Sequence, residues 1–381
     1  TRTTTGSGNT SVGRESMDKN TTGASNVAVG MYALYGNTTA SDNTAVGKSA
    51  LETNTTGSKN TAVGRNALVL NTTGDENSAF GYHSLDANTT GTENTGVGYD
   101  SLQSCTTGSH NTAVGHDALE NVTTGSYNTA LGRDAGRLIT TGASNICIGH
   151  NTNDAANTAN VVAIGAFAAS SNEADNIVSV GYFSLMSNTS GGSNVAVGAN
   201  ALRENTTASY NTAVGHDSME NTTTGFSNAA FGESSLETNT TGDGNTAIGY
   251  AALTSNTTAD NNTAVGRVCL EANTTGSNNT AVGSNALTVC TTGQRNDALG
   301  ANALQSVTTG MDNVGIARQS FPNLTTGNGN VGIGNIGVIS QLFNVTTESD
   351  RLLLGHTNIG NAYIKVSLTV TSDERDKIDF D

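Results

Sequence analysis

The 381-residue sequence lacks tryptophan and is poor in proline, aromatic residues and charge. Pro322 is the single proline, and only 35% of the residues are hydrophobic, 4% aromatic and 13% charged. So little bulky apolar material argues against a large globular core, because it cannot offset the entropy of ordering the chain. The scarcity of charge and proline argues equally against a disordered acidic chain. We therefore expect a repeat architecture in which many similar units stack.

Basic residues are scarce as well, since 16 Lys and Arg stand against 32 Asp and Glu, for a net charge of −16. Nucleic-acid binding needs a basic stripe, and an anionic membrane surface would repel this chain. No stretch approaches the 18 consecutive apolar residues of a membrane span. We expect neither nucleic acid nor membrane insertion. Because Thr1 is not an initiator methionine and no signal-peptide pattern follows it, we expect a fragment or a processed chain.

The sequence contains a 17-residue repeat with the consensus N-T-A-V-G-x-x-A-L-x-x-N-T-T-G-x-x. We number the first asparagine of this consensus position 1. The glycine of position 5 recurs from Gly13 to Gly334 in steps of 17, except for two steps of 16 that end at Gly165 and Gly181. Ala317 is the one exception to glycine in this series. Twenty units cover residues 9–346, and such regularity is typical of a solenoid in which each unit forms one coil.

The residue types at each position predict a strand. Position 4 is always Val, Ile, Leu or Phe, position 3 is small, and position 9 is mostly Leu. Positions 2 and 4 share one face of a short strand, and position 3 lies on the other. We expect positions 4 and 9 to form the bulky columns of a coil with two short strands. The two glycines and the Asn of position 12 are expected at turns that need positive φ.

These features predict an all-β fold, a parallel β-solenoid of the β-roll or β-helix type with about twenty coils. A helix does not fit, because two glycines and several Thr and Asn per unit leave no apolar stripe. At about 4.8 Å per coil the rod would be roughly 95 Å long. Two bulky side chains per coil bury little area. We therefore expect a homo-oligomer, with the small position 3 allowing neighbouring chains to approach closely.

The motif N-T-A-V-G-x-x-A-L resembles the head repeats of trimeric autotransporter adhesins, and still more the repeats of viral and bacteriophage tail fibres. The resemblance implies a homotrimer packed around a threefold axis, located on a virion or another extracellular surface. It implies a structural fibre shaft without enzymatic activity, which supports attachment to a host receptor or glycan. The alternative is a cell-surface adhesin head of the trimeric autotransporter type.

The sequence changes character after residue 346. Leu352–Gly355 and Ala362–Val370 are expected strands of a transition segment, 347–371. The run from Thr371 to Ile378 is similar to the S-D-x-R-x-K opening of the intramolecular chaperone domain that ends many viral fibres. The resemblance implies self-cleavage before Ser372, and the alternative is a solvated charged tail. The junction would comprise Thr371, Ser372, Asp373, Arg375 and Lys377.

The expected domains are accordingly a lead-in, 1–8, the repeats, 9–346, the transition, and the start of a chaperone-like segment, 372–381. Within the repeats, residues 145–193 are irregular. There the spacing slips twice, and Asn160 and Asn176 stand one place early, as if a residue had moved from turn to strand. We favour a tolerated irregularity over a bend, a thinner waist or a lateral pocket. An enzyme on a β-helix, a third possibility, would need its carboxylate groove in this stretch.

The asparagine of position 12 creates many Asn-x-Thr/Ser sequons, which are glycan acceptors in a secretory route. The sequons are at Asn20, Asn37, Asn54, Asn71, Asn88, Asn188, Asn205, Asn239, Asn256 and Asn273. Apolar residues such as Cys105, Val122 and Ile139 interrupt the column, which indicates an inward position. Stacked asparagines also satisfy one another as a ladder. We favour the structural ladder over glycosylation.

We expect no catalytic, cofactor or metal site. The four cysteines, Cys105, Cys147, Cys269 and Cys290, are interpreted as free thiols, since none shows metal-ligand spacing. Three histidines at position 6, His116, His150 and His216, lie in separate coils and are interpreted as solvated. Repeated carboxylates at turn positions are typical of a solvated rim.

Two further functions depend on exposed side chains. Ice binding by the Thr-Thr pairs is disfavoured, because neighbours such as Thr21 and Thr22 point to opposite faces of a strand. Tyrosines of the variable rim are candidates for stacking on sugars. They are Tyr82, Tyr99, Tyr182 and Tyr250.

Overall fold

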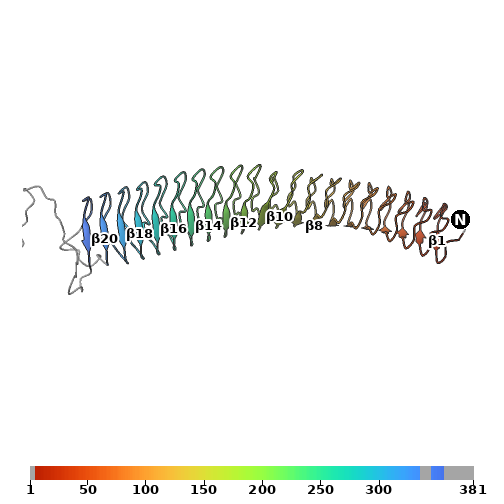
Figure 1. The fold of residues 1–381 in the computed structure, drawn as a ribbon, viewed down its shortest axis with the longest axis horizontal. Helices are drawn as coiled ribbons and strands as arrows, with labels where there is room; N and C mark the ends of the chain where they lie inside the picture. The colour runs from red at the N-terminus through yellow and green to blue at the C-terminus, as the bar shows by residue number, and fades with distance from the viewer. Residues whose placement is uncertain (1–4, 335–344, 356–381) are drawn as a thin grey trace, which may run out of the picture.

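The computed structural model describes residues 5–334 and 345–355 and shows a long, gently bowed parallel β-solenoid (Figure 1). Each coil contributes a strand that pairs in parallel with the strands of the coils before and after it. Strands and turns make up the described residues, among which no helix has the length and apolar character to cross a membrane. The predicted all-β solenoid with a 17-residue period is confirmed.

Most strands hold positions 2–4 of the repeat and are three residues long. They are β1 (Thr10–Val12), β2 (Val27–Val29), β3 (Thr44–Val46), β4 (Thr61–Val63), β5 (Ser78–Phe80), β6 (Thr95–Val97), β7 (Thr112–Val114), β8 (Thr129–Leu131), β9 (Ile146–Ile148), β10 (Val161–Ile164), β11 (Ile177–Val180), β12 (Val195–Val197), β13 (Thr212–Val214), β14 (Ala229–Phe231), β15 (Thr246–Ile248), β16 (Thr263–Val265), β17 (Thr280–Val282), β18 (Asp297–Leu299), β19 (Val314–Ile316), β20 (Val331–Ile333) and β21 (Leu352–Leu354).

The pairing is in register, so each position of the repeat stacks on the same position of the next coil. Between β3 and β4, for example, Ala45 lies opposite Ala62 and Val46 opposite Val63. With neighbouring strands about 4.8 Å apart, a side chain in one coil lies directly against its counterpart in the next. The coils therefore assemble into columns of identical or similar side chains that run along the rod.

Each coil has one strand, so the expectation of two strands per coil is wrong for the described residues. Positions 6–11 form turns instead, with positive φ at positions 7 and 9. In one such turn Tyr32 has φ 62° and Leu34 has φ 50°. Residues in this left-handed region reverse the chain rather than extend it. The turn nevertheless delivers the leucine to the interior, where Leu34 is fully buried.

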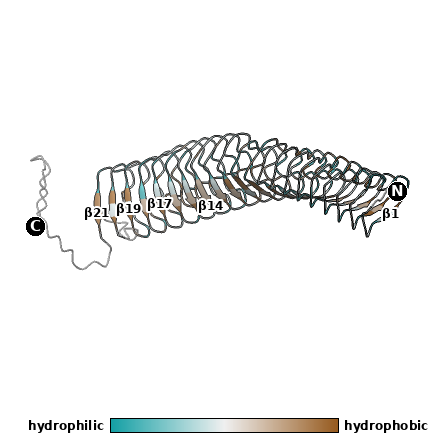
Figure 2. Cartoon of the chain, turned by 45° about the vertical axis from the view of Figure 1, so that its right-hand side comes forward, coloured by the Kyte–Doolittle hydropathy of each residue, from teal (hydrophilic) through white to brown (hydrophobic). Residues whose placement is uncertain are grey.

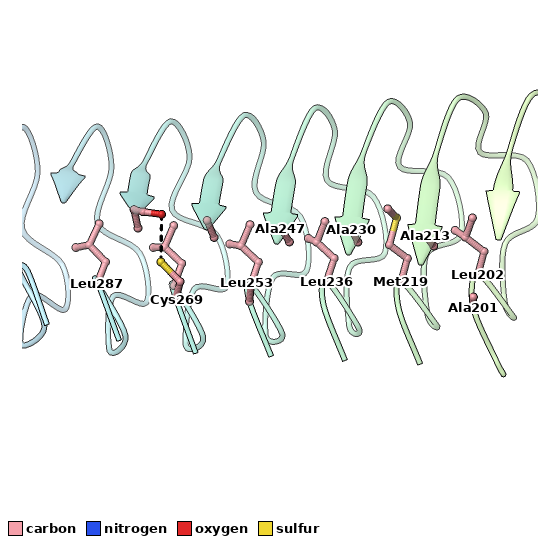
Figure 3. Close-up of a cluster of buried hydrophobic side chains, with 14 of the residues drawn as sticks. Ala201, Leu202, Ala213, Met219, Ala230, Leu236, Ala247, Leu253, Cys269 and Leu287 are labelled. Atoms are coloured by element: carbon pink, nitrogen blue, oxygen red, sulfur yellow. Dashed lines mark hydrogen bonds between the residues drawn. The ribbon is translucent and has the colours of Figure 1, made fainter. Parts of the chain in front are cut away.

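The strand places the small residue of position 3 inside and the bulky residue of position 4 outside, which corrects the expected buried column at position 4. Ala213, Ala230 and Ala247 of successive strands are fully buried, and Figure 3 shows them beside the column that contains Met219 and Leu236. That column fills the space between strand and turn, so the strand has room for little more than a methyl group. The small position 3 is therefore not available for contacts with another chain.

The glycine of position 5 is favoured by backbone conformation and by space, and Ala317, which replaces it in one coil, keeps a positive φ of 110°. Gly64 has φ 144°, and a Cβ there would lie 2.1 Å from the carbonyl oxygen of Gly81 in the next coil. The glycine of position 15 lacks a positive φ, and alanine replaces it at Ala40 and elsewhere. The Asn of position 12 has no positive φ either. The turn expectation is therefore confirmed for position 5 and wrong for positions 12 and 15.

The two short coils are accommodated within the sheet. Strands β10 and β11 have four residues each, and their first residues, Val161 and Ile177, replace the Asn of position 1. Parallel pairing continues without a break from β9 to β12. One residue has thus moved from turn to strand, as the early Asn160 and Asn176 predict.

The described C-terminal segment continues the same sheet. Strand β21 pairs in parallel with β20, with Val331 opposite Leu352. This confirms a strand at the expected Leu352–Gly355 segment, where the coil is longer than 17 residues. The second expected strand, Ala362–Val370, lies outside the described residues.

Candidate functional site: the exposed face of the rod

The outward side of the strands carries a stripe of exposed apolar residues. Position 4 is well exposed in several coils, with Phe80 42%, Leu131 50% and Phe231 41% exposed. Because the strands pair in register, these residues join into one face, and the hydropathy colouring of Figure 2 marks many strands as hydrophobic. A long exposed apolar face is typical of a surface that binds another macromolecule. Other exposed residues of this column are Val12, Val97, Ile248, Leu299, Ile316 and Ile333.

Position 6, which follows the strand, forms an aromatic stack along one edge of this face. Tyr82 and Tyr99 stack with ring centroids 5.3 Å apart, and Tyr99 stacks on His116 at 5.0 Å. The guanidinium of Arg65 lies 5.6 Å from the ring centroid of Tyr82. The ring faces of Tyr99 are therefore occupied by its neighbours, so this residue presents its edge rather than a platform for a sugar.

The other candidate tyrosines have partners of a similar kind. Tyr182 lies against Phe183 with ring centroids 3.9 Å apart. The ring centroid of Tyr250 lies 5.8 Å from the guanidinium of Arg267. Neither ring is therefore an isolated platform for a sugar.

Two tyrosines that were not predicted from the sequence are more exposed. Tyr127 and Tyr210, both at position 17, are 63% and 68% exposed. Tyr127 stacks one ring face on His110, with centroids 4.8 Å apart. The sequence could have indicated them by their position in the repeat, because position 17 directly precedes the next unit and lies on the variable rim.

A carboxylate-rich cluster lies on the turns near β6–β8. Burial raises the pKa of Asp86, Asp100 and Glu120 above the ordinary range of carboxyl groups, since desolvation disfavours the charged form. Asp100 Oδ1 is buried without a hydrogen-bond partner. The turns thus hold carboxylates that are more desolvated than the solvated rim expected from the sequence.

One group in this cluster has the composition of a metal site. Ligand atoms of His116, Asp117 and Asp134 lie within 4.8 Å of one another. Arg133 Nε is only 3.1 Å from Asp134 Oδ2, however, so Asp134 already forms an ion pair. A cation would have to compete with this guanidinium, and the geometry is that of an ion-pair network. His150 Nε2 also lies 3.9 Å from Asp134 Oδ2, so the structure brings His116 and His150 to the same carboxylate.

The asparagines of position 12 form the expected internal ladder. Asn54 is fully buried, and its Nδ2 donates to Asn37 Oδ1 at 3.2 Å and to the Gly57 carbonyl at 2.8 Å. Asn71 Nδ2 in turn donates to Asn54 Oδ1 at 2.8 Å. The ten sequon asparagines of position 12 are all buried, so in the folded chain their amides are shielded within the rod, whereas the sequon asparagines of position 11, Asn121 and Asn221, are half-buried. The ladder interpretation is confirmed.

A second ladder, at position 1, was not predicted from the sequence. The backbone N–H of Asn60 donates to Asn43 Oδ1 at 2.9 Å, and Asn60 Nδ2 donates to the Gly74 carbonyl at 2.8 Å. The same pair of bonds recurs at Asn77, with Asn60 Oδ1 and the Gly91 carbonyl as acceptors. The near-constant Asn at position 1 was the signal, since a purely local turn residue would tolerate Asp, Ser or Gly.

In the Thr-Thr pairs, the first threonine forms a hydrogen bond to the next coil and the second is exposed. The hydroxyl of Thr38, at position 13, donates to the Thr55 carbonyl of the next coil at 3.0 Å. Thr39, at position 14, is exposed. The two threonines therefore do not share one flat array, in agreement with the argument against ice binding.

The four cysteines are buried free thiols, as expected. Burial raises the pKa of Cys105, Cys147 and Cys269 to about 12 and that of Cys290 to about 11. A thiol in this state holds almost no thiolate at neutral pH and is unreactive. The expected self-processing residues, Thr371, Ser372, Asp373, Arg375 and Lys377, lie outside the described residues.

The characteristic features of this chain are thus its 17-residue coil, its two asparagine ladders and its exposed strand face. Comparisons with models of protein families, with curated proteins and with solved structures found no match. The chain is a β-solenoid repeat protein.

Proposed function

We propose that this chain is the shaft of a homotrimeric fibre of the virus or phage type, which holds a host-attachment element away from a particle surface. The observation that carries the proposal is the rod itself, in which about twenty coils stack in register through β2–β20. At about 4.8 Å per coil the rod is roughly 95 Å long. Hydrogen-bonded columns on several sides of the coil suit a part that transmits force along its axis.

The exposed strand face supports association with further copies of this chain. The face extends from Val12 to Ile333, so a partner must offer an equally long surface with the same repeat distance. An identical chain meets both requirements, because its columns of Thr and Val have the same spacing. Burying such a face compensates for the thin interior of a single coil. The contact would use positions 2 and 4 rather than the small position 3.

The oligomer can be tested by sedimentation velocity and light scattering on the full chain. We expect a trimer, and we expect the double variant Phe80→Asp, Phe231→Asp to dissociate it, because both side chains lie on the strand face. Leu70→Asp is the matched control, since Leu70 is 47% exposed but lies on a turn at position 11. A monomeric wild-type chain, or equal dissociation by Leu70→Asp, would contradict the proposal.

The second candidate is an adhesin head of the trimeric autotransporter type. The exposed rings of Tyr127 and Tyr210 support it, since an aromatic ring with an open face can bind a sugar. Both candidates place the chain on a virion or cell surface, with a receptor or glycan as partner. Binding of the full chain to a glycan array, lost in Tyr127→Ala with Tyr210→Ala, would favour the adhesin. A bare shaft would bind none.

Self-processing at the C-terminus is a separate part of the proposal. If a chaperone domain follows Asp381 in the gene, we expect the mature chain to end at Thr371. Intact-mass measurement of the product of the full-length gene tests this, with Ser372→Ala as the variant that retains the downstream segment. A mature wild-type chain that continues past Thr371 would exclude cleavage at this bond.

A further inference from the structure

The buried interior of the rod is interrupted at one coil. The buried hydrophobic residues fall into two separate clusters, one spanning 17–147 and the other spanning 161–324. The boundary falls in coil 145–160, which is the first of the two 16-residue coils. Backbone pairing crosses this boundary, but apolar packing of buried side chains does not.

The interruption begins with the leucine column. At position 9, three successive coils carry Gly136, Asn153 and Ala169 in place of the usual leucine. Leu119 precedes this gap and Leu185 follows it, and both are fully buried. The column that fills the regular coils is therefore absent across three of them.

Polar atoms without partners take the place of the leucine. Thr152 and Asn153 are fully buried, yet Thr152 Oγ1 and Asn153 Oδ1 have no hydrogen-bond partner. Asn153 Nδ2 donates to Thr158 Oγ1 at 2.9 Å within the same coil. A buried polar atom that loses water without gaining a partner destabilises the folded state. The interior of this coil therefore destabilises the solenoid, whereas the interiors of the regular coils stabilise it.

The hydrogen-bonded columns are interrupted at the same place. The hydroxyl of Thr123 donates to the Thr140 carbonyl at 3.2 Å, and the next bond of this kind joins Thr189 to Thr206 at 2.8 Å. Between these two bonds, the hydroxyls of Thr140 and Thr141 donate instead to the side-chain oxygen of Asn157 in the next coil. Among the described residues from 140 to 188, no threonine hydroxyl donates to a backbone carbonyl of the next coil. The position-1 ladder loses its side-chain donors here, because Val161 and Ile177 carry no side-chain amide, although the Val161 N–H still donates to Asn145 Oδ1 at 3.1 Å.

The residues at position 12 follow a similar order on the two sides of the junction. At position 12, a run of asparagines gives way to Cys105, Val122 and Ile139 just before the junction. The same succession recurs near the end of the described coils as Cys290, Val307 and Leu324, each 185 residues after its counterpart. Each half therefore has its own ladder and its own apolar terminal coils.

We propose that coil 145–160 is a built-in joint that divides the rod into two cooperative units, residues 9–144 and 161–333, which unfold independently. In a solenoid each coil contacts its neighbours alone, so the two halves are coupled through the contacts across a single coil. Here those contacts lack the leucine column, the threonine bonds to backbone carbonyls and the side-chain donors of the position-1 ladder. The joint does not depend on the proposed fibre function.

The buried cysteines provide native probes for each half. Cys105 lies in the first unit, and Cys269 and Cys290 lie in the second, where Figure 3 shows Cys269 Sγ bonded to the Ala281 carbonyl. Pulsed alkylation of the full chain in increasing urea, read by peptide mass spectrometry, gives a midpoint for each thiol. A thiol reacts only after its unit unfolds, because burial suppresses the thiolate.

Matched variants test whether the units are independent. Asn71→Val removes a ladder residue from the first unit, and Asn256→Val removes the equivalent residue from the second, where Asn256 Nδ2 donates to Asn239 Oδ1 at 2.9 Å. We expect Asn71→Val to lower the urea midpoint of Cys105 and leave those of Cys269 and Cys290 unchanged. Asn256→Val should have the opposite effect.

If Asn71→Val unfolds its unit outright, Cys105 should react without urea while the second-unit cysteines stay protected. A common shift of all three thiols in either variant would overturn the proposal, because it would mean a single cooperative rod. So would complete labelling of the chain in the absence of urea.

A variant that fills the joint tests whether Thr152 and Asn153 cause the weak coupling between the two units. Thr152→Ala with Asn153→Leu restores the regular residues at positions 8 and 9, and Asn153 already has the left-handed φ, 45°, at which leucine stands in other coils. We expect amide exchange of residues 147–158 to slow by about tenfold or more, and the thiol midpoints of the two units to converge. The converse change, Ala252→Thr with Leu253→Asn, should create a new fast-exchanging site at that coil. Unchanged exchange in both double variants would overturn the role of these residues.

Discussion

Asn88 donates its Nδ2 to Asn71 Oδ1 at 2.8 Å, while its own Oδ1 is buried and has no partner. The next coil carries Cys105 at this position, so no amide follows that could donate to it. The same orphaned oxygen occurs at Asn205 and Asn273, each followed by a residue other than Asn. An unpaired oxygen thus marks the end of each of these asparagine runs.

This geometry predicts different costs for two similar substitutions. Asn71→Val should lower the free energy of unfolding of its unit by about 2–3 kcal/mol, because it breaks two ladder bonds and orphans Asn54 Oδ1. Asn88→Val should cost about 1 kcal/mol, since it removes one orphaned oxygen while creating another. Urea titration followed by circular dichroism measures both. Equal losses would contradict the ladder account.

The glycine of position 5 should be far less replaceable than that of position 15. We expect Gly64→Ala to destabilise by about 3 kcal/mol, because φ 144° is a region reserved for glycine and the new Cβ would meet the Gly81 carbonyl. Gly57→Ala, at position 15, is the control and should cost less, about 1–2 kcal/mol: its Cβ would lie 2.4 Å from the Gly74 carbonyl oxygen, but φ there is not positive, and Ala40 occupies the equivalent site. Thermal unfolding of the two variants in parallel measures the difference, and a ranking in the other order would refute it.

A valine in the left-handed region offers a stabilising change. Val268, at position 7, has φ 57°, where a β-branched side chain is strained. Asn285 holds the same position in the next coil. Val268→Asn should therefore raise the free energy of unfolding, measured by urea titration, by about 1 kcal/mol. The control, Val265→Asn in strand β16, should bring no gain, and a gain there would show that strain is not the cause.

The stability of the turns near β6 should depend on pH through Asp100. Burial raises the pKa of this carboxyl in the folded chain, so its protonated form favours folding. That contribution is complete below the unfolded pKa and is lost as pH rises through the folded pKa. In the equivalent place of a later coil, Asn200 Nδ2 donates to Asp217 Oδ1 at 2.9 Å. The amide introduced by Asp100→Asn would stand in the same relation to Asp117 of the next coil.

We therefore expect Asp100→Asn to stabilise by about 1 kcal/mol at neutral pH, with the gain shrinking as pH falls toward the unfolded pKa. The reciprocal control, Asn200→Asp, should destabilise at neutral pH and recover in acid. Urea midpoints measured from acid to neutral pH give both curves. A gain that is independent of pH would exclude the titration of Asp100 as its source.

The sequence predicted the coil and its period, because repeated Val, Gly and Leu positions must stack once a 17-residue unit closes on itself. It did not predict which side of the strand is inside. Alternation establishes that positions 2 and 4 share a face, but both faces satisfy it. The interior was decided by Leu51 and its counterparts, which reach inward from a left-handed turn and leave room for Ala45 rather than Val46.

Of the candidate features, the position-12 ladder was predictable, because Cys105 and Val122 at that position indicate burial. The exposed strand face was not predictable, because it depends on whether position 3 or position 4 packs inside the coil. The joint could be located from Gly136, Asn153 and Ala169, but its orphaned atoms depend on three-dimensional contacts that spacing does not convey.

The single unpaired oxygen at the end of an asparagine run has a consequence for how such rods change length. A coil inserted inside a run adds one amide bond and leaves the number of orphaned oxygens as it was. Inserting whole coils inside a run therefore adds almost no cost from unpaired buried oxygens. A change in the number of runs does add such a cost, because each run ends on an unpaired oxygen. Duplication of a 17-codon segment can thus act as a ruler, lengthening the molecule in steps of about 4.8 Å without redesign of its ends.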